Sequence, residues 1–341
     1  MVAVGRGPTI RDVARAAGVS NATVSRVLSG VPTVDRELAA RVRHQVELLG
    51  YRPSVMAQGL VRGRTGTVGV LVPDLANPYF YDVLHGIERA AERDDVWMFV
   101  ADSHENPGGE LDRALELARR VDGLVLCSPR MDEGDLKVLV ERFPHVVCTH
   151  RSLSELSVPT VRSDMRRGTL HLLRHLQAVG HVRVAYFMGP PDSWSNAERM
   201  AAMREVDGLE IEYVECGSSI EDGYACAEPD RLHGVSAVMG YNDLVALGCL
   251  SRLAEEGVRV PDDIAVAGFD DIPFARFASP GLTTVRAATV ELGAEAWRNL
   301  AALLEGRTLR PRTLPTELIV RGSTLATASR RVDRTVTEQS R

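Results

Sequence analysis

Several features that define other protein classes are missing from this sequence. Its five cysteines form no C-x-x-C pair, and no apolar run approaches the length that crosses a membrane. It contains no G-x-S-x-G elbow, no H-E-x-x-H pair and no G-x4-G-K-[ST] loop, which are common signatures of hydrolases, zinc proteases and nucleotide-binding enzymes. We therefore expect a protein that is not an enzyme, holds no metal or cofactor, and has no membrane partner.

Further absences bear on compartment and assembly. The chain does not open with a charged segment followed by an apolar run, as a secretory signal does. Cys127 and Cys148 lie in apolar runs, where a reduced thiol packs as a small hydrophobe, and we expect a cytoplasmic protein. No leucine heptad closes the chain, so a homodimer is expected rather than a coiled-coil tetramer. The polar segment 327–341 is expected to be disordered.

Positive charge is unevenly distributed, and arginine supplies nearly all of it because Lys137 is the only lysine. Up to Arg64 the chain has ten arginines against four acidic residues, whereas the remainder has 30 basic and 42 acidic residues. The whole chain carries a net charge of −6. This asymmetry favours binding of phosphate, and hence of nucleic acid, by the N-terminal segment alone.

The segment from Thr9 to Leu60 is typical of a helix-turn-helix module. Ala14, Gly18 and Val24 follow the spacing A-x3-G-x5-V, in which a small residue lets two helices approach and glycine takes a left-handed turn. Thr9 and Ser20 stand where helix N-caps are expected. An ordinary buried helical hairpin has the same pattern. A third amphipathic stretch, 35–49, and an Arg52-Pro53 break before a run of seven residues favour the DNA-binding interpretation.

From Val68 onward, short apolar runs alternate with amphipathic stretches. This alternation predicts parallel sheets that are covered by helices on both faces. Two such sets, divided near 161–164, indicate two doubly wound lobes with a ligand site at the carboxyl ends of the strands. We expect seven strands, at 68–72, 96–100, 123–127, 146–148, 182–188, 237–241 and 264–269.

Polar and aromatic side chains recur at the ends of these strands. Asp and Asn are also favoured helix caps, but recurrence at one topological position favours a site for a hydroxyl-rich or heterocyclic solute. Tyr79, Phe80 and Trp194 could cover the apolar face of such a ligand. The other candidates are Asp74, Asn77, Arg151, Asp164, Arg199, Asn242 and Asp270.

These motifs resemble the lactose-repressor/galactose-repressor (LacI/GalR) family of bacterial transcriptional regulators. The N-terminal segment TIRDVARAAGVSNATVSRVL is similar to the family's helix-turn-helix, and GYRP followed by AQGL to its turn and hinge helix. YNDLVALGCLSRLAEEGVRVPDDIAVAGFDD and GFDDIPFARFASPGLTTVR resemble two long segments of the family's core. The resemblance runs from Thr9 to about Thr324 and so covers nearly the whole chain.

The resemblance implies an all-α helix-turn-helix domain (1–53), a hinge helix and linker (54–65), and a periplasmic-binding-protein-like core (66–326) for effector binding and dimerisation. The N-lobe would comprise 66–160 and 289–313, and the C-lobe 161–288 and 314–326. The chain would cross between the lobes near residues 161, 288 and 314. The positions matching Asp74, Tyr79, Phe80, Asp164, Arg199, Asn242 and Asp270 would line the effector pocket.

We predict that the protein is a repressor of double-stranded operator DNA. A small effector such as a carbohydrate would control it. Base contacts are expected from Asn21, Ala22 and Arg26, since the arginine fork matches guanine O6 and N7. Phosphate contacts are expected from Thr9, Ser20, Thr23, Ser25 and Tyr51. The hinge residues Ser54, Ala57, Gln58 and Leu60 would enter the minor groove, where the leucine would wedge between base pairs.

The sequence also departs from the family pattern and leaves alternatives open. Asp164-Met165 stands where the family has an Asp-Asn pair, and 200–228 lacks the common R-x-x-G-F run, so the effector is not identified. Gly59 lowers the helix propensity of the hinge by about 1 kcal/mol relative to alanine. A solute-binding protein or an enzyme on the same two-lobed fold is the alternative. His171 and His175 lie four residues apart on one helix, without an evident third metal ligand.

Overall fold

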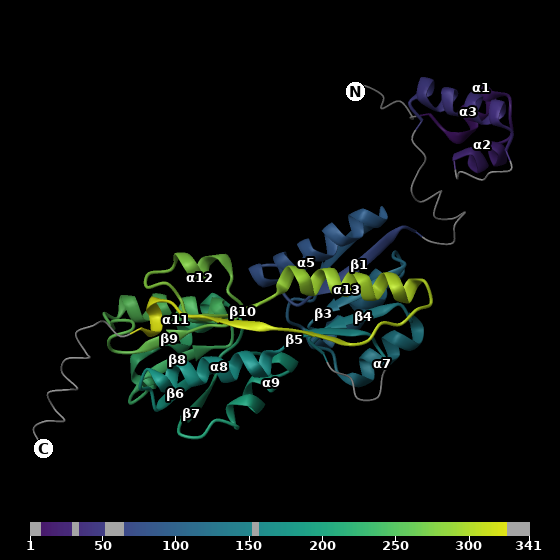
Figure 1. Ribbon diagram of the computed structural model, residues 1–341. Coiled ribbons are helices and arrows are strands. Elements are labelled where there is room, and N and C mark those ends of the chain that lie inside the picture. Colours follow the sequence, from purple (N-terminus) through teal and green to yellow (C-terminus); the bar gives the residue numbers. More distant parts are fainter. Residues whose placement is uncertain (1–7, 29–33, 52–64, 152–156, 326–341) are drawn as a thin grey trace, which may run out of the picture. The chain divides into compact units, whose positions relative to one another are not determined.

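The structure, a computed structural model, describes residues 8–28, 34–51, 65–151 and 157–325. The chain divides into two compact units, residues 1–66 and 67–341 (Figure 1). The proposed hinge residues Ser54, Ala57, Gln58 and Leu60 and the segment 327–341 lie outside the described residues.

The described part of the smaller unit contains three helices, each begun by residues that satisfy its first N–H groups or fix its first turn. They are α1 (Ile10–Ala17), α2 (Asn21–Leu28) and α3 (Arg36–Leu49). Before α1, the Thr9 hydroxyl donates to the Asp12 carboxylate at 2.7 Å. Before α2, the Ser20 hydroxyl accepts from Thr23 N at 3.2 Å. Gly18 ends α1 at a φ of 65°, which places it in the left-handed region that glycine enters without a Cβ clash.

A small apolar core holds these helices together. Its fully or almost fully buried side chains are Val13, Ala14, Ala17, Val24, Val27 and Val42. Arg41 on α3 also donates from Nε to the carbonyl oxygen of Ala17 at 3.0 Å, which links the third helix to the end of the first. The first two helices therefore pack as a helix-turn-helix, and the exposed residues of α2 are left facing away from the core.

The described residues of the larger unit form three sheets. A six-stranded parallel sheet has the order β11-β5-β4-β3-β1-β2, a four-stranded parallel sheet has the order β7-β6-β8-β9, and β10 and β12 form an antiparallel pair. The first sheet is built from β1 (Thr67–Val72), β2 (Trp97–Asp102), β3 (Gly123–Cys127), β4 (Val146–Thr149), β5 (Thr160–Ser163) and β11 (Arg312–Leu314). The others are built from β6 (Arg183–Met188), β7 (Glu210–Glu215), β8 (Ala237–Gly240), β9 (Ala265–Ala267), β10 (Thr284–Ala287) and β12 (Thr316–Ile319).

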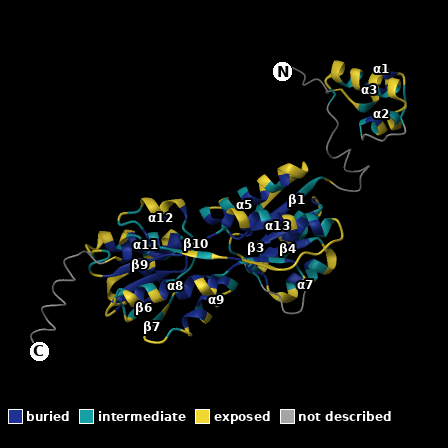
Figure 2. Ribbon diagram, in the orientation of Figure 1, coloured by how far each residue is buried: buried dark blue, intermediate teal, exposed yellow. Residues whose placement is uncertain are grey.

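Helices cover both parallel sheets, so the two lobes are doubly wound as predicted. The N-lobe has α5 (Pro78–Ala91), α6 (Pro107–Ala118), α7 (Glu133–Arg142), α13 (Thr289–Leu304) and the short helix η1 (Glu92–Asp94). The C-lobe has α8 (Met165–Ala178), α9 (Trp194–Met203), α10 (Ile220–Cys226), α11 (Asp243–Glu255), α12 (Pro273–Phe277), η2 (Pro229–Leu232) and η3 (Gly322–Thr324). In Figure 2 the strands β3 and β4 are almost uniformly buried, which accounts for their continuous apolar sequence.

The chain crosses between the lobes at three places, and the first differs from the expected position. Strand β5 pairs with β4 and β11, so residues 161–163 belong to the N-lobe sheet rather than to the C-lobe. The other crossings follow β10, where α13 returns to the N-lobe, and β11, after which β12 pairs with β10. Because β5 is short and half polar, its sequence did not show which sheet it joins.

Helices α5 and α13 lie side by side with their backbones in close contact (Figure 1). A Cβ at Gly86 would overlap the carbonyl oxygen of Val290, and one at Gly293 would overlap that of Val83. The same arrangement recurs between α10 and α11, at Gly223 and Gly248. In the part of each lobe that the structure describes, a pair of helices thus packs so closely that their contact requires glycine.

Candidate functional site

A polar cavity lies between the two lobes, at the carboxyl ends of the parallel strands. Its lining combines three aromatic side chains, two arginines, two acids and several neutral polar groups. The residues are Asn77, Tyr79, Phe80, Glu105, Ser128, Arg130, His150, Met165, Ser195, Arg199, Ser218, Tyr241, Asn242 and Asp270. Such a mixture of directional polar groups and aromatic faces suits a small polar solute.

Six of the ten predicted effector residues line this cavity, and two of them also cap helices. Asn77 accepts from Tyr79 N at 3.0 Å at the start of α5, and Asn242 accepts from Val245 N at 2.9 Å at the start of α11. The helix-cap and ligand-site interpretations therefore both fit these two residues. The remaining four are Tyr79, Phe80, Arg199 and Asp270.

The other four predicted residues do not line this cavity. Asp74 accepts from Ala76 N at 2.8 Å, and Asp164 caps α8 by accepting from Arg167 N at 3.0 Å, so both carboxylates serve the local backbone. Arg151 and Trp194 instead line a more open, largely acidic pocket, which shares Arg130 with the cavity. The expected single cluster is thus divided between an inner cavity and an outer pocket.

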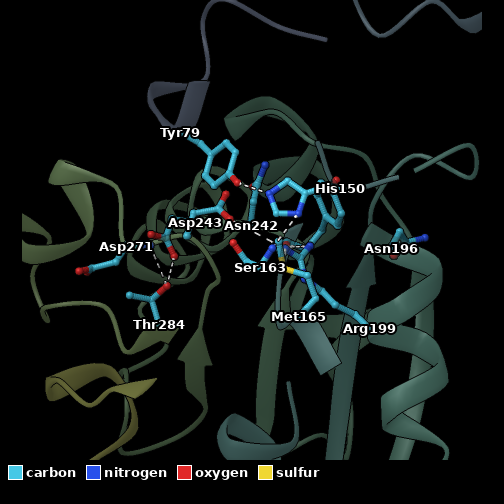
Figure 3. Close-up of polar contacts among 12 residues, drawn as sticks. Tyr79, His150, Ser163, Met165, Asn196, Arg199, Asn242, Asp243, Asp271 and Thr284 are labelled. Atoms are coloured by element: carbon cyan, nitrogen blue, oxygen red, sulfur yellow. Dashed lines mark hydrogen bonds and ion pairs between the residues drawn. The ribbon is translucent and has the colours of Figure 1, made fainter. Parts of the chain in front are cut away.

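A buried histidine orients a tyrosine hydroxyl at the cavity wall. His150 Nε2 and Tyr79 Oη are 2.6 Å apart, and Ser163 N donates to His150 Nδ1 at 3.4 Å (Figure 3). Burial, with smaller contributions from Arg199 and Arg130, lowers the pKa of His150 to about 3, so the ring is neutral. With Nδ1 accepting, the ring proton lies on Nε2 and is donated to the tyrosine oxygen. The Tyr79 hydroxyl proton is then available to a ligand.

The first of the two cavity arginines is fully paired. Arg130 donates from Nε and Nη2 to the two carboxylate oxygens of Glu105, at 2.6 and 2.9 Å, and from Nη1 to Ser128 O at 3.0 Å. The buried Glu110 accepts from Arg130 N at 2.7 Å and from Met131 N at 2.5 Å, which fixes the backbone that carries the arginine. This bidentate pair neutralises the Arg130 charge within the protein.

The second arginine, Arg199, lies over the rings of Phe269 and Tyr241, with Cζ 3.9 and 4.8 Å from the ring centroids. Its Nη1 donates to Tyr241 O at 2.7 Å, and Nη2 lies 3.8 Å from both the Met165 sulfur and the Asp270 carboxylate. Burial raises the pKa of Asp270 to about 7, although Arg199 partly offsets this effect. Asp270 has a φ of 118°, a conformation uncommon for residues other than glycine.

Behind this wall, a fully buried carboxyl group ties three segments of the C-lobe together. Asp243 accepts from Ile272 N at 2.8 Å and from the Thr284 hydroxyl at 2.5 Å (Figure 3). Burial, with the nearby Asp270, raises its pKa well above the ordinary range. This contact holds the segment that carries Asp270 against the start of α11.

Eight lining residues were not predicted from the sequence, although the rule used for the others could have found some of them. Ser128 and Arg130 follow β3, Tyr241 follows β8, and His150 follows β4, one position before the predicted Arg151. Glu105 lies in a loop, and only its contact with Arg130 places it at the cavity. The full set is Glu105, Ser128, Arg130, His150, Met165, Ser195, Ser218 and Tyr241.

A second candidate surface is the outer side of α2 in the smaller unit. Asn21, Ala22 and Arg26 are exposed, Thr23 and Ser25 are half-buried, and the Ser20 and Thr23 hydroxyls are 2.9 Å apart. Thr9 is exposed and Tyr51 is half-buried. Within the described part of the chain, no ion pair involves Arg26.

Two family models match the chain, one for each unit. Residues 9–54 match the model described as bacterial regulatory proteins, lacI family, and residues 173–324 match the periplasmic binding protein-like domain. The transcriptional regulator KdgR of Bacillus subtilis is 30% identical over 322 residues, covering 91% of this chain and 95% of the relative. The repressor CytR of Escherichia coli is 30% identical over 331 residues, covering 93% and 96%.

Solved structures match the same architecture. The lac repressor dimer bound to operator and the anti-inducer ONPF has a TM-score of 0.80 at 26% identity, over 94% of this chain and 100% of that one. The transcriptional regulator CelR in complex with cellobiose has a TM-score of 0.69 at 31% identity, over 93% and 99%.

A helix-turn-helix unit joined to a two-lobed binding unit defines a DNA-binding transcriptional regulator, and the relatives are named as regulators and repressors rather than as enzymes. The chain belongs to the LacI family of bacterial regulatory proteins.

Among the described residues, no helix is long and apolar enough to span a membrane. Nor do the residues that the structure describes include a group of three or more His, Cys, Asp or Glu side chains that could hold a metal ion. His175 instead forms a hydrogen bond with Thr324, at 2.8 Å.

Proposed function

We propose that this regulator is a homodimeric repressor of a pseudo-palindromic operator, controlled by a small polar effector bound between the lobes. The observation that carries the proposal is the presence, in one chain, of a helix-turn-helix with an exposed polar face and a polar cavity between two lobes. A regulator of bacterial genes meets its DNA in the cytoplasm, which is therefore the compartment we propose.

The DNA-binding unit would place α2 in the major groove. Arg26, Asn21 and Ala22 would contact base edges, while Thr9, Ser20, Thr23, Ser25 and Tyr51 would hold phosphates and set the register. Exposure of the three base-reading candidates supports this orientation, because the opposite side of α2 is occupied by Val24 and Val27 in the core. The hinge residues Ser54, Ala57, Gln58 and Leu60 would enter the minor groove between two half-sites.

Dimerisation is supported by an exposed apolar strand at the edge of the N-lobe sheet. Strand β2 is the last strand of that sheet, and Trp97, Phe99 and Val100 on it are 68, 49 and 38% exposed. Edge strands with large exposed apolar side chains are unfavourable in water unless they are covered. A second copy of the chain would cover them, and it would supply the second half-site contact that a pseudo-palindromic operator requires.

Coupling between the two sites would follow from movement of the lobes. Tyr79 and Phe80 of the N-lobe belong to one apolar cluster with Leu244 and Ile272 of the C-lobe, so ligand binding between the lobes changes a packed interface. If that change alters the separation of the two hinge segments in the dimer, short helices that need DNA to form would be lost. An effector could act as inducer or corepressor by this route.

Arg26→Ala is expected to relax base preference at one symmetric pair of operator positions. Loss of a bidentate contact to guanine costs about 1–3 kcal/mol, or about 5- to 150-fold in affinity for the preferred site. The measurement is the binding of the variant to the selected operator and to single-base variants of it, at fixed salt.

The matched control is Arg43→Ala, which removes the same charge from an exposed position on α3. This control should lower the affinity for the selected operator and for its single-base variants by the same factor, so the base preference should not change. Equal and uniform losses for both variants would contradict the base-reading role of Arg26 and the orientation of α2.

A further inference from the structure

The two cavity arginines differ in how many of their guanidinium nitrogens have hydrogen-bond acceptors within the protein. This difference indicates which chemical groups an effector could offer them. Both side chains are 3% exposed. Arg130 has a carboxylate on two of its nitrogens and a carbonyl oxygen on the third. Arg199 donates to the carbonyl oxygen of Tyr241 and has the neutral Tyr186 hydroxyl nearby, but its buried Nε has no hydrogen-bond partner. A buried guanidinium without a hydrogen-bonded anion is costly, so this group is an open anion site.

Asp270 does not complete the pairing of Arg199. Its carboxylate is 3.8 Å from Nη2, beyond hydrogen-bond distance, and no hydrogen bond reaches that carboxylate from the described residues. The second neighbour of Nη2 is the Met165 sulfur at 3.8 Å, which is a weak acceptor. Aromatic faces on Phe269 and Tyr241 supply cation–π contacts but no acceptor.

The charges around the cavity leave room for one negative charge. Arg130 and Glu105 neutralise each other, and Glu110 is occupied by two backbone N–H groups. Arg199 then faces Asp270 at 3.8 Å, and burial raises the pKa of that carboxyl group to about 7. A monoanion fits this balance, whereas a dianion would bring one more negative charge than Arg199 can neutralise.

We propose that the effector carries a carboxylate on a polyhydroxylated carbon chain, as an aldonic acid does, and that Arg199 binds this carboxylate. A guanidinium binds a carboxylate through charge-assisted hydrogen bonds, with geometry that a neutral hydroxyl does not match. The Tyr79 hydroxyl would donate to one of the ligand's oxygens. The proposal rests on the proposed function and names the ligand class of its cavity.

The test is calorimetric titration of the full-length protein with matched pairs of solutes. Gluconate, galactonate, xylonate and ribonate are each compared with the alditol of the same configuration, which differs only in having a hydroxymethyl group in place of the carboxylate. At least one aldonate is expected to bind about 10- to 100-fold more tightly than its alditol, as a charged hydrogen-bonded pair implies. Absence of any aldonate with a dissociation constant below about 1 mM overturns the proposal.

Two variants identify the groups responsible. Arg199→Gln should abolish the preference for the aldonate, and the control Arg142→Gln, on the exposed surface of α7, should retain it. Asp270→Asn should tighten aldonate binding at pH 8, because it removes a negative charge that competes for Arg199. If Arg199→Gln does not fold, the test rests on Asp270→Asn. Weaker aldonate binding by that variant than by the wild type at pH 8 overturns the proposal.

The pH dependence follows from the groups that face Asp270, which are Arg199 on α9, Tyr79 on α5 and Asp243 on α11. In the wild type, aldonate affinity should fall by up to about tenfold per pH unit above pH 7, and Asp270→Asn should be insensitive over the same range. Suppose that an alditol binds as tightly as its aldonate and releases the protein from DNA. That result would overturn the proposal that the effector carries a carboxylate, but it would leave the proposed regulator function intact. Loss of operator recognition irrespective of ligand, in the Arg26 experiment, would instead overturn the proposed function.

Discussion

Gly293→Ala is expected to destabilise the larger unit by about 3 kcal/mol, at the upper end of the usual cost of overpacking. The added methyl group would overlap the carbonyl oxygen of Val83 on α5, and its neighbours are backbone atoms that cannot move aside as a side chain can. Helix α13 would have to shift from α5, where Trp297 and Leu300 contribute to the N-lobe core. Thermal unfolding should show a decrease of about 6–12 °C in Tm.

The control for this variant is Gly108→Ala, in the first turn of α6, where an added Cβ meets only the Asn106 side chain at 3.7 Å. Alanine is the better helix former, so that variant should be neutral or more stable by up to about 1 kcal/mol. Equal stability of the two variants would contradict the backbone contact between α5 and α13.

Asp270→Asn is expected to stabilise the protein at pH 8 and to have little effect near pH 4. The folded-state pKa of about 7 exceeds the ordinary value of 3.8, so the native state binds this proton more tightly than the unfolded state does. That contribution to stability is fully present below pH 4 and is lost as the pH rises through 7, with an upper limit of about 4 kcal/mol. Asparagine cannot ionise, and it tolerates positive φ, so the variant should avoid this loss.

Urea unfolding of both proteins at pH 5 and pH 8 measures the effect as a difference in unfolding free energy. The matched control is Asp192→Asn, which alters an exposed carboxylate near the outer pocket. If Asp270→Asn is no more stable than the wild type at pH 8, the ionised Asp270 carboxylate does not destabilise the folded state, and the prediction is wrong.

Much of the fold was predictable because its signals are local. Gly18, the caps at Thr9 and Ser20, and the apolar spacing of α1 and α2 are each fixed by neighbouring residues. Most predicted strands correspond to strands of the structure for the same reason. Strands β5, β7, β10 and β11 were not among those predicted. The sequence of β7, EIEYVE, has three glutamates in six residues because the strand lies at a half-exposed edge of its sheet.

The cavity was less predictable because it depends on contacts across the chain. Strand-end position identified Asn77, Asn242 and Asp270, but it could not separate them from Asp74 and Asp164, whose carboxylates face the local backbone. Nor could it reveal that Arg130 is neutralised by Glu105 while Arg199 is not. Those relationships become visible only when residues separated by 25 or more positions are brought together.

The central claim is that a solute bound between the lobes decides whether the helix-turn-helix holds a specific operator. Selection of bound DNA from a random pool by the full-length protein, repeated with each solute that calorimetry shows to bind, tests it most directly. We predict enrichment of an inverted repeat with two half-sites, and a change of at least about tenfold in affinity for that site with one such solute. Failure to enrich any sequence, or an operator affinity unchanged by every solute that binds, would contradict this account.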